Sequence, residues 1–314
     1  MSITLGVSFG QNPSLMPSNT TLVSQRIRRR KLMRERVVTV GEDQPLVGIL
    51  SEPSTDQITE PRTAVILLNS GVIHRVGSCR LSVTLARALT EKAGIPTFRF
   101  DFSGIGDSEA RRGTLTANQA AVDEVQEVMD YLGKWKKYDR FILYGLCSGA
   151  FAAYRTALSD QRVLGTVQLD GYCYLTWKSY FHYYAPRLLS PARWYSLILR
   201  KLGLKKVKKG VEVSGIEERF FEVPDFSSYP PKADVEQGLK KLNERGLHML
   251  YVFLGNEHYS YLNQFRDCFR SVPFGENLTV IHRPLATHIL SEPEDQAVVV
   301  DAIAAWVHKL QQTA

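Results

Sequence analysis

The sequence predicts an α/β fold in which helices cover both faces of a mostly parallel central sheet. Short apolar runs such as 63–68 and 163–169 are typical of strands that are buried on both faces. Segments with helical periodicity, such as 115–135, alternate with these runs. The regular alternation breaks once, between about 172 and 243, which indicates an insertion. At 314 residues the chain is long enough for one such domain with an inserted segment.

The elements follow one another in an order that gives about eight strands. An antiparallel hairpin is expected first, because two alternating apolar runs flank the turn residues 41–44. The closing helix has Pro293 at its start, a favoured position for proline. The predicted strands are 37–40, 46–50, 63–68, 97–100, 141–144, 163–169, 248–254 and 278–282, and the predicted helices are 79–92, 115–135, 150–157 and 294–310.

Three regions of different composition follow from this pattern. Residues 1–36 form a basic, flexible N-terminal arm, since 26–36 carries seven Lys or Arg against one acidic residue. Residues 37–171 and 244–314 form the α/β core. Residues 172–243 are aromatic and basic, and we expect a helical cap over the carboxyl ends of the strands, where such sheets bind ligands.

Composition and charge exclude several classes of protein. No apolar run is long enough to cross a bilayer and no hydrophobic signal core is present, so a cytoplasmic location is expected. The four cysteines have no metal-ligand spacing, and we expect neither a metal nor a cofactor. The net charge of +7 favours acidic or phosphate-bearing partners, or peripheral contact with a membrane. No motif supports nucleic-acid binding.

The segment 141–157 carries the clearest chemical signal. An apolar strand enters Gly145-Leu-Cys147-Ser-Gly149 and continues into a good helix former. Strand, Gly-x-nucleophile-x-Gly and helix make the pattern of a nucleophile elbow, in which glycines give room to a sharp turn. Cys147 takes the place of the usual serine. The alternative is a glycine-rich turn with a half-buried structural cysteine.

Three motifs together resemble the α/β-hydrolase superfamily over roughly 37–312. Asn69-Ser-Gly-Val72 resembles its oxyanion loop, Asp101-x-x-Gly-x-Gly-x-Ser108 resembles its loop after the fourth strand, and 145–149 resembles its elbow. The stretches 71–77 and 98–108 are similar, more narrowly, to bacterial hydrolases found beside exosortase and exopolysaccharide systems. The resemblance implies an α/β-hydrolase fold with an inserted helical cap.

The resemblance also implies a triad in the order nucleophile, acid, histidine. Cys147 would be the nucleophile, and His288, after the last strand, would be the histidine; His282 is less well placed. The acid is expected at Glu257, the carboxylate in the loop after the penultimate strand. Asp170, at the end of the strand that follows the elbow helix, is the alternative, because some branches of the superfamily place the acid there.

Other residues of the predicted site come from the same loops and from the cap. Superfamily geometry implies oxyanion donors in the backbone amides of Ser148 and Val72. Arg75 would bind a carboxylate or phosphate, or would instead brace two loops by pairing with Asp101 or Asp107. The residues expected to contact substrate are Gly71, His74, Arg75, Tyr172 and Trp177.

A cysteine nucleophile favours acyl-thioester chemistry over general ester hydrolysis. A thiolate at a helix N-terminus beside a histidine attacks a thioester and retains the acyl group in activated form. We therefore expect a thioesterase or esterase that works through a Cys–His–acid triad and an acyl-enzyme. The alternatives are an acyltransferase with an amine, alcohol or thiol acceptor, and a non-catalytic binding protein of the same fold. An acidic acyl carrier protein or coenzyme A would suit the basic cap.

Overall fold

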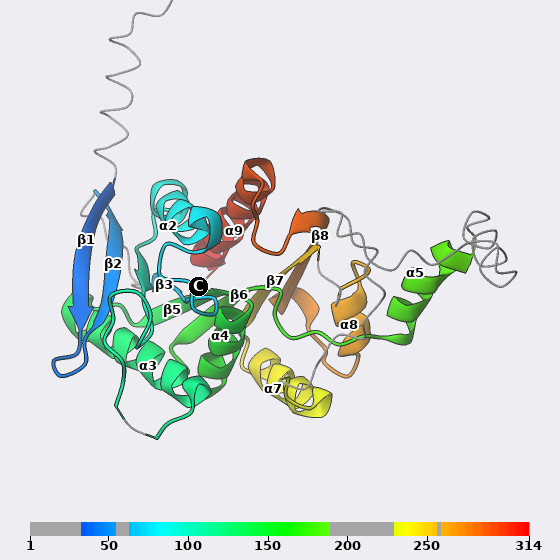
Figure 1. Ribbon diagram of the computed structural model, residues 1–314, viewed down its shortest axis with the longest axis horizontal. Coiled ribbons are helices and arrows are strands. Elements are labelled where there is room, and N and C mark those ends of the chain that lie inside the picture. Colours follow the sequence, from blue (N-terminus) through cyan, green and yellow to red (C-terminus); the bar gives the residue numbers. More distant parts are fainter. Residues whose placement is uncertain (1–32, 55–62, 113, 189–228, 256–258, 314) are drawn as a thin grey trace, which may run out of the picture.

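The computed structural model describes residues 33–54, 63–112, 114–188, 229–255 and 259–313. Among these residues, eight strands form one sheet in the order β1-β2-β4-β3-β5-β6-β7-β8 (Figure 1). This sheet confirms the predicted fold class. The strands are β1 (Met33–Val40), β2 (Leu46–Pro53), β3 (Thr63–Leu67), β4 (Thr97–Phe100), β5 (Arg140–Leu146), β6 (Val163–Leu169), β7 (His248–Gly255) and β8 (Leu278–Thr287).

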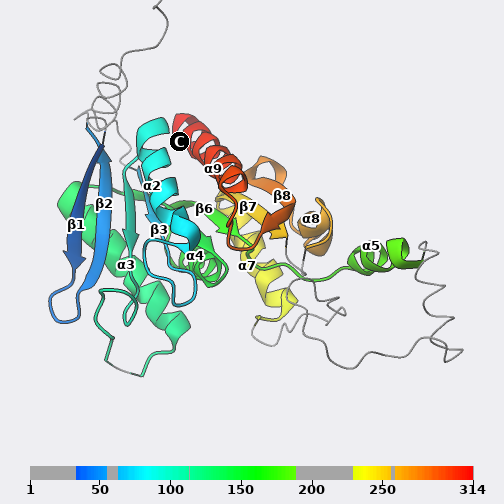
Figure 2. The same cartoon turned by 45° about the horizontal axis from the view of Figure 1, so that its top comes forward.

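Helices cover both faces of this sheet. Helices α2 and α9 lie on one face and contact each other, and α3, α4 and α7 lie on the other (Figures 1 and 2). The described helices are η1 (Ser78–Arg80), α2 (Leu81–Lys92), α3 (Ala117–Lys136), α4 (Ser148–Ser159), α5 (Trp177–Leu188), α7 (Lys232–Glu244), α8 (Gln264–Cys268), η2 (Gly275–Asn277) and α9 (Pro293–Thr313).

Strand pairing brings the loops of interest to one edge of the sheet. β1, β2 and β4 pair antiparallel, whereas the pairs from β4–β3 through β7–β8 are parallel. The carboxyl ends of β3, β5, β6 and β8 therefore lie at the same edge. β5 sits between β3 and β6, so the elbow that follows it is flanked by the loops of both neighbours.

The alternation of side chains along each strand divides the core into two clusters. In β3, Ala64 and Ile66 pack toward α3 and α4, while Val65 and Leu67 pack toward α2 and α9. Both clusters consist of buried side chains, as expected of strands that are covered on both faces. The apolar runs in the sequence are explained by this double burial.

Several boundaries differ from those expected, and two of these differences have a clear physical reason. β1 begins at Met33, inside the run assigned to the arm, because its charged side chains pair along the sheet: Arg36 binds Glu52, and Glu35 binds Arg87. The helix expected from residue 79 begins at Leu81. Cys79 and Arg80 have positive φ angles of 48° and 63°, which an α-helix does not accommodate.

The range expected to form the cap, 172–243, contains two described helices that differ in packing. α7 contributes Val235, Leu239 and Leu242 to the core cluster that includes α3 and α4. α5 extends away from the sheet, and Trp177 and Phe181 on it are exposed (Figures 1 and 2). Residues 189–228, which carry most of the Lys and Arg residues of this range, lie outside the described residues. The cap stays a prediction.

Gly145 and Gly149 make the close approach of β5 and α4 feasible. A Cβ on Gly145 would lie 2.1 Å from the backbone carbon of Gly149, and one on Gly149 would lie 2.4 Å from the carbonyl oxygen of Asn69. Both obstacles are backbone atoms, so no side-chain rotation relieves them. The glycine pattern at 145 and 149 is therefore a steric requirement of the turn.

We expect Gly145→Ala to lower the free energy of unfolding by at least about 2 kcal/mol, because overpacking against backbone forces the turn apart. Gly133→Ala is the matched control: it lies within α3, and its nearest obstacle is 3.2 Å away. There the gain in helix propensity offsets the tight contact, so the free energy of unfolding should change by no more than about 1 kcal/mol. Urea unfolding of both variants measures this. Equal destabilisation by the two would contradict the steric account.

Candidate active site

Cys147 occupies a strained position at the start of α4. Its φ and ψ are 54° and −116°, outside the regions favoured by residues with a side chain. Two hydrogen bonds hold the backbone of Cys147 in this conformation. Its amide donates to Leu169 O at 2.9 Å, and its carbonyl accepts from the Phe151 amide at 3.2 Å. The thiol is partly exposed. This is the geometry of a side chain presented from a sharp strand-to-helix turn.

Asp170 and His288 form a short hydrogen bond beside this thiol. Asp170 Oδ2 lies 2.6 Å from His288 Nδ1, although the two residues are 118 positions apart. Asp170 is nearly buried, whereas the His288 side chain is 43% exposed. The Cys147 side chain lies close enough to His288 to raise the pKa of the imidazole. The three side chains are thus neighbours.

The carboxylate is fixed by the strands on either side of it. Asp170 ends β6, where its amide donates to Val252 O and its Oδ1 accepts from the Leu254 amide, both at 2.9 Å. Its φ is 47°, so the chain turns sharply as it leaves the sheet. Because both bonds reach into β7, the second carboxylate oxygen is left facing His288.

His288 follows β8 directly, in a turn closed by a hydrogen bond from the Leu290 amide to Thr287 O at 2.9 Å. The hydrogen bond to Asp170, and then the interaction with the Cys147 side chain, raise the pKa of His288 to about 10 against the opposing effect of burial. The imidazole is therefore held in its charged form at neutral pH, next to two groups that can carry negative charge.

The loop after β3 reaches the start of α4. Ser70 and Ile73 pair across a tight turn, in which the Ile73 amide donates to Ser70 O at 3.0 Å. At the tip of this turn Gly71 has a φ of 54°, and its amide donates to Ser148 Oγ at 2.7 Å. The turn and the elbow are thereby joined at the place where the oxyanion donors were expected.

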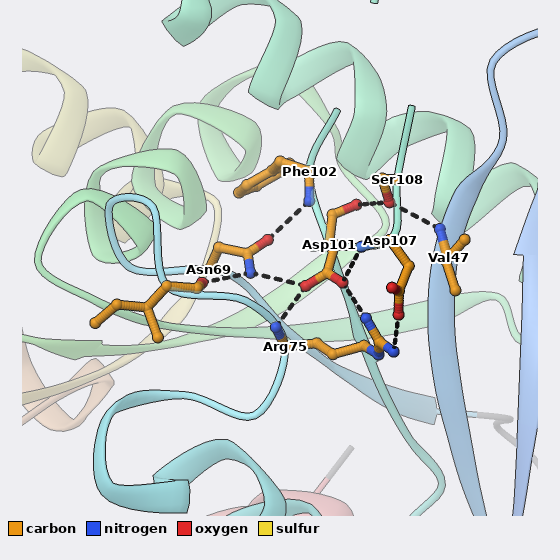
Figure 3. Close-up of polar contacts among 8 residues, drawn as sticks. Val47, Asn69, Arg75, Asp101, Phe102, Asp107 and Ser108 are labelled. Atoms are coloured by element: carbon orange, nitrogen blue, oxygen red, sulfur yellow. Dashed lines mark hydrogen bonds and ion pairs between the residues drawn. The ribbon is translucent and has the colours of Figure 1, made fainter. Parts of the chain in front are cut away.

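A buried polar network holds the base of that loop (Figure 3). Asp101 is fully buried and accepts from the Arg75 backbone amide, and its carboxylate forms an ion pair with the Arg75 guanidinium. The guanidinium also binds Asp107. Asn69 adds hydrogen bonds to Ile73 O and to the Phe102 amide, each at 2.8 Å. Arg75 is thus engaged in the bracing contact that was the alternative to substrate binding.

The motif after β4 explains why this network fits. A Cβ on Gly106 would lie 2.2 Å from the Asp101 carboxylate, so only glycine leaves room for it. Ser108 Oγ donates to Asp101 O at 2.7 Å and accepts from the Val47 amide at 2.8 Å, which links the loop to β2. Pairing of Arg75 with Asp101 or Asp107 was one alternative predicted from the sequence, and the structure shows both pairs.

The remaining expected site residues lie in different surroundings. Tyr172 is buried, stacked on Phe151 with ring centroids 4.1 Å apart, and its hydroxyl accepts from Arg155 at 2.6 Å. Val72 is 91% exposed and His74 is also exposed. Trp177 is exposed on α5, away from the sheet. Glu257 lies outside the described residues.

Tyr229 is a further residue near the site that the sequence did not single out. Its ring packs edge-on against Phe151 and Tyr172, each with centroids 5.2 Å away. Burial raises the pKa of its hydroxyl, and negative charge on Cys147 raises it further, which places the tyrosine within electrostatic reach of the thiol. Its signal, one aromatic residue in an aromatic-rich segment, was too common to identify it.

The described part of the chain also contains a cavity away from the triad. A cavity of about 360 Å³ lies between the loop after β4 and α3, lined by residues such as Phe102, Ile105 and Ala121. None of Cys147, Asp170 and His288 lines it. Within the described ranges no group of three or more acidic, histidine or cysteine side chains is arranged to bind a metal ion. No described helix is both long enough and apolar enough to span a membrane.

We expect Asp101→Asn to lower the free energy of unfolding by about 3–5 kcal/mol, because it leaves the Arg75 charge partly buried without its main partner. Asp301→Asn is the matched control, since Asp301 pairs with Lys92 on the surface, where both side chains are more than half exposed. Its effect should stay below about 1 kcal/mol. Urea unfolding distinguishes the two, and an equally small effect at Asp101 would refute the anchoring role.

The raised pKa of His288 predicts a pH-dependent contribution to stability. A folded pKa of about 10 against an ordinary 6.5 stabilises the folded state fully below pH 6.5, and the contribution declines to zero as pH rises through 10. The stability difference between wild type and His288→Gln should therefore be larger at pH 6 than at pH 10. The trend should weaken in an Asp170→Asn background. A difference independent of pH would contradict the coupling.

Comparisons with known proteins identify the family and the fold of the chain. The family described as serine aminopeptidase, S33 matches residues 59–219, about half of the chain, including the elbow but not His288. A comparison with curated proteins found no match.

Solved structures share the fold at low sequence identity. An esterase from Pyrococcus furiosus is 13% identical, with 97% of this chain and 99% of that chain covered at a TM-score of 0.54. The esterase domain of a Rhodothermus marinus protein is 17% identical, with 88% and 99% covered at 0.53. A serine hydrolase without a lid from Xanthomonas campestris is 14% identical, with 88% and 95% covered at 0.51. These structures show the α/β-hydrolase fold, and the family match over half of the chain shows that the chain belongs to the family described as serine aminopeptidase, S33.

Proposed function

We propose that the protein is a cysteine-dependent hydrolase of acyl thioesters or esters, with Cys147 as nucleophile, His288 as general base and acid, and Asp170 as the acid of the triad. The observation that carries the proposal is the 2.6 Å hydrogen bond between Asp170 and His288, whose imidazole also interacts with the Cys147 side chain. This connectivity supports Asp170 over Glu257. The family's name refers to serine enzymes, and here cysteine occupies the elbow position.

The first half of the reaction forms an acyl-enzyme. Cys147 Sγ, as the thiolate, attacks the carbonyl carbon of the substrate, and the carbonyl oxygen becomes an oxyanion. The intermediate collapses with cleavage of the bond to the thiol or alcohol leaving group, which takes a proton from His288. Asp170 holds the imidazole with Nδ1 toward itself, so the other ring nitrogen faces the reacting atoms.

The second half returns the enzyme to its resting state. His288, now neutral, takes a proton from water as the water oxygen attacks the acyl carbon. Collapse of this second intermediate breaks the Sγ–C bond, releases the carboxylic acid and regenerates the thiolate beside the imidazolium. Asp170 holds the imidazolium in place before each turnover.

Two backbone donors are proposed for the oxyanion. The Ser148 amide is in the first turn of α4, where geometry leaves amides without an intrahelical partner and the helix field favours negative charge. The second donor comes from the Gly71–Val72 turn, which contacts the elbow through Ser148 Oγ. Because both donors are fixed before substrate binds, they stabilise the transition state without reorganisation.

The thiol favours thioester substrates. Attack on a thioester replaces one thioester with another, so formation of the acyl-enzyme costs little free energy. The narrower likeness to exosortase-associated hydrolases, and recruitment of an acidic carrier protein or coenzyme A by the basic segment, stay part of this proposal. A transferase would use the same acyl-enzyme and pass it to an amine, alcohol or thiol, so the fate of the adduct separates the two activities.

The test is intact-mass analysis and turnover on a panel of acyl-coenzyme A and acyl-carrier thioesters. Wild type should form an acyl adduct that decays in water, Cys147→Ala should form none, and His288→Ala should form it far more slowly. Asp170→Asn should lower kcat by about 10²–10⁴-fold.

Glu257→Gln is the control for the acid and should stay near wild type. Loss of activity in Glu257→Gln with full activity in Asp170→Asn would overturn the assignment of the acid. Undiminished turnover by Cys147→Ala would overturn the cysteine mechanism. An adduct that persists in water but reacts with an added amine or alcohol would favour transfer over hydrolysis.

A further inference from the structure

The hydrogen bond from the Gly71 amide to Ser148 Oγ is not used by the triad. It is 2.7 Å long and joins residues 77 positions apart, one at the tip of the turn after β3 and one directly after Cys147. Both residues are exposed, so the bond does not belong to the hydrophobic core. It connects the two segments from which the oxyanion donors are proposed to come.

Some backbone amides of the turn donate hydrogen bonds within the protein, and one does not. The Gly71 amide donates to Ser148 Oγ, and the Ile73 amide donates to Ser70 O. Between them, the Val72 amide has no hydrogen-bond partner among the residues that the structure describes. Val72 is also 91% exposed. This pattern leaves Val72 as the amide of the turn that is available to a substrate oxygen.

The base and the tip of this loop are held differently. At the base, Asn69 and Arg75 are fixed by the buried Asp101 carboxylate. At the tip, Gly71 has the positive φ of 54° that a side chain would oppose, and a Cβ placed there would meet nothing within 4 Å. The tip therefore gains little from packing, and the bond to Ser148 is the described contact that ties it to the elbow.

We propose that Ser148 is a positioning residue whose hydroxyl, by binding the Gly71 amide, holds the Val72 amide next to the Ser148 amide so that both face the substrate oxygen. The inference rests on the proposed function. A serine hydroxyl suits this role because its oxygen accepts a hydrogen bond from the Gly71 amide. The hydroxyl also belongs to the same residue as the second oxyanion donor, the Ser148 amide. The side chain at 148 thereby sets the spacing of the two donors.

The test compares Ser148→Ala with Ser148→Thr in single-turnover acylation and in steady state. Ser148→Ala should lower kcat and the acylation rate by about 10–100-fold with KM changed less than about threefold, since donor alignment matters most in the transition state. Ser148→Thr retains a hydroxyl and should restore most of the activity. The added methyl is tolerated because the site is exposed.

Ser159→Ala is the matched control, because it removes a hydroxyl from the other end of α4. It should leave kcat unchanged. Amide hydrogen exchange gives a readout independent of activity: the Gly71 amide should exchange faster in Ser148→Ala than in wild type or Ser148→Thr.

The outcomes separate the positioning role from the proposed function. If Ser148→Ala keeps wild-type kcat while Cys147→Ala is inactive, the positioning role is overturned and the triad stands. If alanine and threonine variants lose activity equally, the hydroxyl is not the cause and the role is likewise overturned. If Cys147→Ala remains active, the cysteine mechanism fails and the positioning role fails with it. Faster exchange of the Gly71 amide in Ser148→Ala would then show only that the hydrogen bond between Gly71 and Ser148 exists.

Discussion

The hydrogen bond between Asp170 and His288 is the interaction on which the proposed chemistry depends. It joins the residue after β6 to the residue after β8, so the sheet places both partners near each other. β7 lies between these strands and holds Asp170 through Val252 and Leu254. The core of the protein thereby sets the position of an imidazole at its surface, next to a thiol that the strained elbow presents.

A second constraint acts through the loop after β3. Its base is fixed by the buried Asp101 and its tip is tied to the elbow by Ser148. Gly106 leaves room for the Asp101 carboxylate, and Gly149 leaves room for the Asn69 carbonyl at the base of the loop. The charged side chains here hold the loops in place and do not bind substrate. Arg75, which could have bound an anion, is paired with the carboxylates of Asp101 and Asp107. The proposed oxyanion donors are backbone amides, which such bracing can hold still.

Much of the fold could be predicted because it rests on local signals. The doubly buried strands were evident from continuous apolar runs, and the elbow from its glycines. The start of β1 was missed because Glu35 and Arg36 look like part of a charged arm until their partners across the sheet are known. The contact between Asp170 and His288 depends on strand order, which brings β6, β7 and β8 together. No local pattern distinguishes Asp170 from Glu257, so Glu257 was expected as the acid from the sequence and Asp170 was kept as the alternative.

The most direct measurement is the rate of alkylation of individual cysteines by iodoacetamide at pH 6, followed by peptide mass analysis. Cys79 is exposed and serves as the internal reference in the same chain, whereas Cys173 and Cys268 are buried. The account predicts that Cys147 reacts much faster than Cys79, because Cys147 lies at the N-terminus of α4 beside the imidazole that Asp170 orients, and that Asp170→Asn removes most of this advantage. A Cys147 that reacts no faster than Cys79, or that is unaffected by Asp170→Asn, would contradict it.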